Sequence, residues 1–389
     1  MVNNVFLNRS NLSIEPISNL QKLARVFIAF FLMLGAVFLY SREKINANDF
    51  ALGSENQHTA EATAGLNYTA ASISDIKFII NQPITTCVDQ KPLKKIMWLG
   101  NSQLHTINQF QSGQHIAPYW LRQKAQDPSC FWPYGFSLPN ANFQEFFILS
   151  SYISSATHID AAVVPLVFDD LREDGLRDDF SLLLTKAFRS ELSESETALD
   201  ILQRFESGFL SPKEGESINK GLEGFVQQHF EASLSNSLGK IFPLWRERAN
   251  LRVNLLTDLY FMRNFILNIK PNTIRKQIPV RYERNMAALE ETVRRLRDHG
   301  IPLILYIVPI RQDVTLPYDL VEYSAWKSSI AHLAATYNVE LLNLEARVAP
   351  ELWGSYDKDN IDFMHFQGKG HELVADAIAP ALKKILGDF

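Results

Sequence analysis

Short apolar runs alternate with helical patterns along most of the chain, and this alternation strongly restricts the folds it can adopt. The apolar runs that read as strands lie at 95–100, 160–168, 303–308 and 339–344. Between them, apolar residues recur at the spacing of three and four that forms one face of a helix. One such set is Met286, Leu289, Val293 and Leu296. Strands that alternate with helices predict an α/β fold with three layers, in which helices cover a mostly parallel sheet.

Residues 171–280 interrupt this alternation. They contain amphipathic or largely apolar stretches at 178–188, 196–210 and 251–267, and no convincing strand. We predict a helical insertion within the α/β domain. It forms either a lid, a partner surface or a membrane-facing cap, or it simply adds to the packing.

The N-terminal region contains an unbroken apolar run, residues 26–40, which Lys22 and Arg25 precede. At about 1.5 Å per residue, the run is slightly short for a hydrocarbon core of roughly 30 Å. Leu23, Ala24 and basic residues whose side chains reach the membrane surface could extend it. We interpret 23–40 as a transmembrane anchor and 1–22 as an N-terminal tail. A cleaved signal peptide is the alternative, although the preceding segment is long and no A-x-A-like site follows.

Basic residues around the anchor favour an N-terminus in the cytoplasm, so the rest of the chain would lie outside that membrane. Residues 41–75 are rich in Asn, Ala, Ser and Thr and are interpreted as a stalk, which leaves 76–389 for the α/β domain. Outside the membrane, Cys87 and Cys130 can form a disulfide; otherwise they are two buried free thiols. Two cysteines are too few for a four-ligand zinc site.

Charge and motifs exclude several functions. The net charge is −5 and no long basic run occurs, which argues against a nucleic-acid partner. The chain has neither G-x-x-x-x-G-K-[ST] nor G-x-G-x-x-G, so nothing in it indicates a nucleotide cofactor, and we expect no cofactor.

A candidate nucleophile follows the first predicted strand. Ser102 comes just after Gly100, and reactive groups in open α/β sheets collect beyond the carboxyl ends of strands. A serine nucleophile needs a histidine base and gains from an acid that orients it. Asp362 and His365, three residues apart before the last helix, supply both. We expect Ser102 Oγ and His365 to lie within roughly 3–5 Å. The alternatives are a turn serine and a chance D-x-x-H.

Two segments resemble motifs of a known family. "WLGNSQ" at 98–103 resembles the first block of the SGNH, or GDSL-type, hydrolase superfamily, with Asn101 in place of the usual aspartate, and "DFMH" at 362–365 resembles its last block. The likeness covers roughly 95–170 and 285–385. It implies a flavodoxin-like parallel sheet with Ser102 as nucleophile, His365 as base and Asp362 as its orienter.

The middle blocks of that family fit less well. Asn140 stands near the second-block glycine, so the backbone N–H groups of Ser102 and Asn140 would hold an oxyanion. Asp169 and Asp170 stand where an asparagine is expected, and an ionised carboxylate cannot donate a hydrogen bond. The residues interpreted as substrate contacts are Asn101, Gln103, Arg172 and Arg311. A surface salt bridge explains Arg311 equally well.

The layout of anchor and catalytic domain is similar to that of anchored SGNH proteins, including alginate O-acetyltransferases and the D-alanyl-lipoteichoic-acid transfer protein. This resemblance implies a serine acyltransferase or esterase that acts on a bacterial cell-envelope polysaccharide beside a multi-span membrane acyltransferase. It would be held in the inner membrane by 23–40, with its domain on the periplasmic side. A general ester or lipid hydrolase, and a non-catalytic assembly protein with a degenerate fold, remain alternatives.

Two further histidines lie near these motifs. His105 either lines the site or has a surface or helix-capping role. His371 could in principle join Asp362 and His365 at a metal ion, but "HELVAD" lacks the second histidine of H-E-x-x-H. We therefore expect no metal site.

Overall fold

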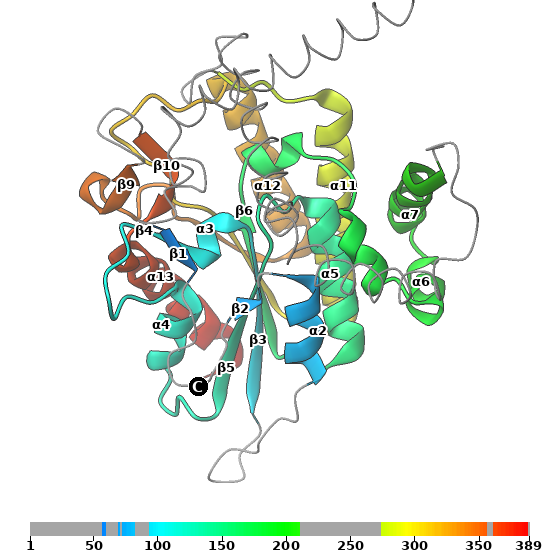
Figure 1. The fold of residues 1–389 in the computed structure, drawn as a ribbon, viewed down its shortest axis with the longest axis horizontal. Helices are drawn as coiled ribbons and strands as arrows, with labels where there is room; N and C mark the ends of the chain where they lie inside the picture. The colour runs from blue at the N-terminus through cyan, green and yellow to red at the C-terminus, as the bar shows by residue number, and fades with distance from the viewer. Residues whose placement is uncertain are drawn as a thin grey trace, which may run out of the picture.

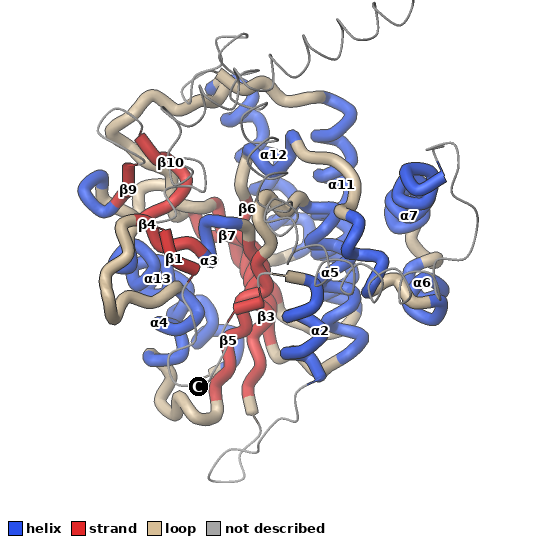
Figure 2. The backbone as a smooth tube through the Cα atoms, viewed as in Figure 1, coloured by secondary structure: helices blue, strands red, loops and turns tan. Residues whose placement is uncertain are grey.

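A parallel sheet of six strands, in the order β2-β5-β3-β6-β7-β8, forms the centre of the computed structural model (Figures 1 and 2). Its strands are β2 (Thr69–Ala70), β3 (Lys94–Gly100), β5 (Phe131–Ser137), β6 (Ala161–Leu166), β7 (Leu303–Ile307) and β8 (Glu340–Asn343). The four strands predicted from apolar runs are confirmed. From β5 to β8 the order is 2-1-3-4-5, the doubly wound order of flavodoxin-like sheets.

The structure describes residues 57–59, 69–70, 72–81, 93–210, 274–355 and 361–387. The predicted tail 1–22 and anchor 23–40 lie outside these ranges. Within them, no helix combines the length and the apolar character that crossing a membrane requires.

Helices cover both faces of the sheet, as the alternation predicts (Figure 1). One face carries α2 (Ile73–Asn81), α5 (Phe143–Ala156), α11 (Pro279–Asp298) and α12 (Leu320–Tyr337); the other carries α4 (Ala117–Gln123) and α13 (Gly368–Leu386). Successive side chains of a strand point to opposite faces. Met97 and Leu99 therefore pack into the first core, and Ile96 and Trp98 into the second. The predicted three-layer α/β architecture is confirmed.

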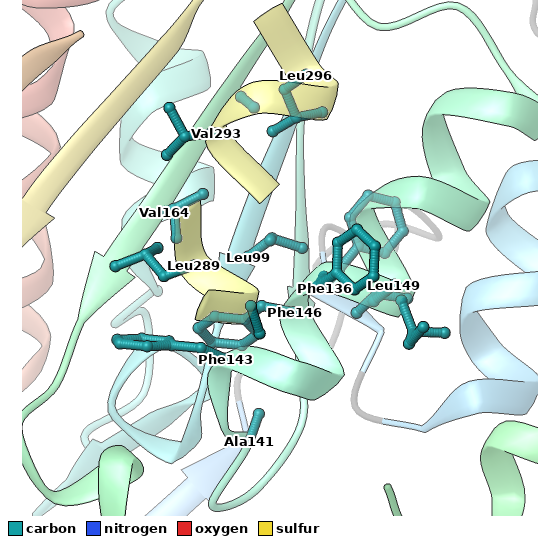
Figure 3. Close-up of a cluster of buried hydrophobic side chains, with 14 of the residues drawn as sticks. Leu99, Phe136, Ala141, Phe143, Phe146, Leu149, Val164, Leu289, Val293 and Leu296 are labelled. Atoms are coloured by element: carbon teal, nitrogen blue, oxygen red, sulfur yellow. The ribbon is translucent and has the colours of Figure 1, made fainter. Parts of the chain in front are cut away.

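The first core is rich in aromatic side chains. Figure 3 shows Leu99 and Val164 of the sheet facing Phe143 and Phe146 of α5 and residues of α11. The α11 residues are those of the predicted apolar face: Leu289, Val293 and Leu296 are at most 1% exposed, and Met286 packs against them. This packing fixes the positions of β3 and β6, whose carboxyl ends carry the site described below.

The described part of the predicted insertion is helical. It contains the 3₁₀ turns η3 (Asp169–Arg172) and η4 (Asp178–Leu182) and the helices α6 (Lys186–Leu192) and α7 (Glu196–Leu210). Helices α6 and α7 lie beyond α5 (Figure 1) and bury Phe188, Leu192, Ile201 and Phe205 in the first core. This part of the insertion adds to the packing. Residues 211–273 lie outside the described ranges.

The predicted stalk, 41–75, is wrong at its C-terminal end. Strand β1 (Gln57–Thr59) pairs with β4 (Thr106–Asn108), and β2 extends the sheet beside β5. Helix α2 begins at Ile73, whose side chain is buried with those of Ile76 and Ile79. The domain therefore starts before residue 76.

The cysteines were predicted either to pair or to remain free thiols. Cys130, one residue before β5, is disulfide-bonded, so the free-thiol alternative is wrong for it. Cys87, the other cysteine of the chain, lies outside the described residues.

Candidate active site

Ser102 lies at the carboxyl end of β3, as its position in the sequence predicts. The strand ends at Gly100, and the short helix α3 (Ser102–His105) begins at once, with Asn101 as its N-cap. A Cβ atom on Gly100 would lie 2.5 Å from Cδ2 of Leu104, so this sharp turn from strand to helix requires glycine. Beyond β3 the chain crosses to β5 on one side and β6 on the other, which makes this edge the topological switch point of the sheet.

The candidate base and acid come from a hairpin outside the main sheet, formed by β9 (Trp353–Ser355) and β10 (Ile361–Phe366). His365 Nε2 lies 3.0 Å from Ser102 Oγ, although the two residues are 263 positions apart. His365 Nδ1 lies 2.9 Å from Asp362 Oδ2. The predicted proximity of Ser102 and His365 is confirmed, and all three side chains are at most 8% exposed.

The Asp362 carboxylate is fully buried and surrounded by donors. Its Oδ1 accepts the backbone N–H groups of Met364 at 2.8 Å and His365 at 3.0 Å. Its Oδ2 accepts Asn108 Nδ2 at 2.8 Å as well as the imidazole. An ionised carboxylate can only accept, so Nδ1 of His365 must carry the ring proton. The unprotonated Nε2 then faces Ser102 Oγ, the arrangement that general-base catalysis requires.

His105 is buried beside this group and has a structural partner. Its Nδ1 donates to Ser137 Oγ at 2.7 Å, because the Ser137 hydroxyl donates in turn to the Asn101 carbonyl at 2.5 Å. Burial, and to a smaller extent the nearby His365, lowers the pKa of His105 to about 4. This chain of hydrogen bonds fixes the backbone just before Ser102.

His371 is fully buried in α13, and its Nε2 donates to the Thr106 carbonyl at 3.1 Å. Burial lowers its pKa to about 3. Both ring nitrogens of His365 already face Ser102 and Asp362. Over the described ranges, no group of three or more His, Cys, Asp or Glu side chains could hold a metal ion.

Asn101 and Gln103, which the sequence analysis interprets as substrate contacts, find partners inside the protein. Asn101 Nδ2 donates to Asp170 Oδ2 at 2.9 Å, and Gln103 Nε2 donates to the carbonyls of Pro309 at 3.1 Å and Met364 at 2.9 Å. Both residues are buried. Their amide groups therefore connect parts of the site to one another.

The two predicted oxyanion donors, the backbone N–H groups of Ser102 and Asn140, lie in different surroundings. Ser102 opens α3, where backbone N–H groups have no partner within the helix. Asn140 is exposed, with a left-handed backbone (φ 52°), in the turn between β5 and α5.

Asp169 and Asp170, which stand at the expected asparagine position, have different environments. Asp169 forms ion pairs with Arg172 and Arg275. Burial raises the pKa of Asp170 well above its ordinary value; the hydrogen bond from Asn101 opposes this, and neighbouring carboxylates add to it. Asp170 Oδ2 accepts a hydrogen bond from Asn101 Nδ2 at 2.9 Å, so this carboxyl oxygen is an acceptor in the structure.

The two predicted substrate-contact arginines also have internal partners. Arg172 donates to the Lys276 carbonyl at 3.1 Å and pairs with Asp169. Arg311 pairs with Asp313 and donates through Nη1 to the carbonyls of Gly354 at 2.9 Å and Asp362 at 3.3 Å. Arg311 thus forms the alternative salt bridge and also contacts the hairpin that carries His365.

Two buried residues at the site were not predicted from the sequence. Asn108 and Ser137 are each 0% exposed and donate, respectively, to Asp362 and to the Asn101 carbonyl. Neither lies at a motif spacing, and each becomes recognisable only once β4 and β5 are placed beside β10 and β3.

Comparisons with known proteins give distant structural likenesses. No protein-family model and no curated protein matches the chain. Among solved structures, a "putative acylhydrolase" from Bacteroides fragilis is 9% identical, with a TM-score of 0.36 over 81% of this chain and 97% of its own. A GDSL-like lipase from Bacteroides thetaiotaomicron is 9% identical, with a TM-score of 0.35 over 80% of this chain and 96% of its own. Likenesses at this level have no bearing on activity.

Proposed function

We propose that this chain is a serine esterase or acyltransferase in which Ser102 is the nucleophile, His365 the general base and Asp362 the residue that orients it. The observation that carries the proposal is the buried relay from Ser102 Oγ to His365 Nε2 at 3.0 Å and from His365 Nδ1 to Asp362 Oδ2 at 2.9 Å. It lies at the carboxyl end of β3, where α/β sheets bind their ligands.

The geometry supports acyl transfer in two halves. In the first, Ser102 Oγ attacks the ester carbonyl carbon while His365 Nε2 takes the hydroxyl proton, and Asp362 stabilises the imidazolium. The Ser102 N–H at the start of α3 donates to the oxyanion. His365 then protonates the leaving alcohol, and an acyl-enzyme forms. In the second half, His365 takes a proton from water or from an acceptor hydroxyl, whose oxygen attacks the acyl carbonyl carbon. The bond from this carbon to Ser102 Oγ then breaks, and His365 returns the proton to Ser102 Oγ.

We propose that the chain acts on a bacterial cell-envelope polysaccharide at the outer side of an inner membrane, and that this polysaccharide is either the acyl acceptor or the acyl ester. The support is the apolar run at 26–40 and the likeness of "WLGNSQ" and "DFMH" to SGNH motifs. The disulfide of Cys130 agrees with an oxidising compartment. A multi-span membrane acyltransferase is the partner that would supply the acyl group.

The test uses the full chain in detergent and its Ser102→Ala variant. A fluorophosphonate probe should modify Ser102 in the wild type, as mass spectrometry of the peptides would report. Hydrolysis of a small acetyl ester should fall by about 10⁴-fold or more in Ser102→Ala. Modification of another serine, or equal activity of the two proteins, would contradict the nucleophile assignment.

Two further measurements address the finer proposal. Product analysis with a glycan acceptor distinguishes transfer from hydrolysis, because only transfer yields an acylated glycan. Fractionation of cells that produce the chain with and without residues 1–40 tests the anchor. Equal amounts of both proteins in the membrane fraction would contradict it.

A further inference from the structure

The hairpin that carries His365 is not held by a regular strand ladder. Strands β9 and β10 are paired at Ile361 with Ser355 and at Phe366 with Trp353, and the register shifts between these two pairs. Asp362 and His365 lie inside the irregular stretch, where the ladder is disrupted. Contacts with other elements must therefore fix where His365 lies relative to Ser102.

Gln103 supplies such a contact from the helix that carries the nucleophile. Its Nε2 donates to the Met364 carbonyl at 2.9 Å and to the Pro309 carbonyl at 3.1 Å. Met364 directly precedes His365, and Pro309 lies in the segment that follows β7. One amide group thus connects α3, β10 and the end of the sheet.

The Met364 peptide is held on both sides. Its carbonyl accepts from Gln103, and its N–H donates to Asp362 Oδ1 at 2.8 Å. Asp362 in turn binds the N–H and the imidazole of His365. The position of the Gln103 side chain is therefore passed to His365 through a peptide group and a carboxylate.

Gln103 itself is well fixed and has no donor to spare. It is 5% exposed, and its backbone N–H donates to Asn101 Oδ1 at 3.0 Å. A glutamine amide has two N–H donors, and the two carbonyls use both. A substrate would have to displace one of these bonds to reach the same nitrogen.

We propose that Gln103 is a positioning residue that sets the separation of Ser102 Oγ and His365 Nε2 by holding the Met364 carbonyl. The inference rests on the proposed function for its kinetic consequence, but not for its geometry. Because a misplacement of about 1 Å can cost roughly 10²-fold in rate, a bond that fixes this separation affects the chemical step.

The kinetic test compares Gln103→Met with Gln367→Met. Methionine keeps the length of the side chain and removes both donors. Gln367 is a matched control because its Nε2 donates beside this hairpin, to Gln109 Oε1 at 3.0 Å and to the carbonyls of Glu351 at 3.4 Å and Trp353 at 3.5 Å. None of these three acceptors lies in the segment from Asp362 to His365.

Gln103→Met should lower both kcat for a small acetyl ester and the rate of fluorophosphonate labelling by about 10²-fold, with KM nearly unchanged. Gln367→Met should react like the wild type. A role in binding substrate predicts the opposite pattern, in which KM rises while labelling by the small probe is unchanged, and that result would overturn the inference.

A crystal structure of Gln103→Met separates this inference from the proposed function. The distance from Ser102 Oγ to His365 Nε2 should exceed hydrogen-bonding range, about 3.5 Å. If it stays at 3.0 Å, the positioning role is wrong, whatever the activity. If the wild type is never labelled, the proposed function fails while this distance still decides the positioning role. Should Gln103→Met not fold, Gln103→Glu, which keeps the length and has no amide donor, replaces it.

Discussion

Acid should destabilise the fold through two buried histidines, His105 and His371. Burial lowers their pKa values to about 4 and about 3, whereas an exposed histidine in the unfolded chain titrates near a pKa of about 6.5. Between these limits the unfolded state binds more protons than the folded state does. The stabilisation is therefore fully present above pH ~6.5 and is lost as the pH falls toward the folded pKa values.

The magnitude follows from the depth of the shift. At pH 5, about 1.5 units below the unfolded pKa, each ring removes about 2 kcal/mol from the free energy of unfolding, at ~1.4 kcal/mol per unit. The two together remove about 4 kcal/mol, a large share of the roughly 5–15 kcal/mol that stabilises a typical domain.

His371→Gln isolates one of the two contributions. A glutamine nitrogen can replace Nε2 as the donor to the Thr106 carbonyl, and it does not titrate. Urea unfolding at pH 7.5 and pH 5 should show a loss about 2 kcal/mol smaller in His371→Gln than in the wild type. His332→Gln, at an exposed position, should show the wild-type loss. A His371→Gln protein as sensitive to acid as the wild type would refute the reasoning.

Three other substitutions have defined outcomes. Asn108→Ala removes a donor to the Asp362 carboxylate and should lower kcat for an acetyl ester about 10–100-fold, as expected for ~1.5–3 kcal/mol; unchanged kcat would argue against an orienting role. Gly354→Ala would place its Cβ 1.8 Å from Asn108 Cγ and displace that side chain, so it should lower kcat by a similar factor. If the losses of the two single variants multiply in the Asn108→Ala/Gly354→Ala double variant, the shared mechanism is contradicted. Asp170→Asn removes a carboxyl group whose raised pKa lowers the free energy of unfolding of the wild type as the pH rises above the ordinary pKa of an aspartate. In urea unfolding, the free energy of unfolding of the variant should therefore rise relative to that of the wild type between pH 4 and pH 8. A difference that does not change with pH would contradict this.

The sequence predicts the layers and the core-facing helices because their signals are local. The apolar run of β3 and the spacing of Leu289, Val293 and Leu296 in α11 lead directly to buried elements. Ser102 is predictable for the same reason, since it follows a strand end.

Other features depend on contacts between distant segments, which no local pattern records. The pairing of β1 with β4 and the contact between Asn108 and Asp362, 254 positions apart, are of this kind. The raised pKa of Asp170 is another such feature, because it depends on burial and on surrounding carboxylates that folding brings together.

The two halves of the candidate site are held by different forces, and this should separate stability from activity. Ser102 follows β3, whose Trp98 and Leu99 are fully buried in the two cores, so its position depends on hydrophobic packing. His365 lies on an irregular hairpin whose position depends on a few hydrogen bonds from side chains such as Gln103 and Arg311. Core substitutions should therefore lower the free energy of unfolding first. Substitutions of Gln103 or Arg311, which bind the backbone of Met364 and Asp362 beside His365, should instead lower kcat by displacing the base while the sheet stays folded.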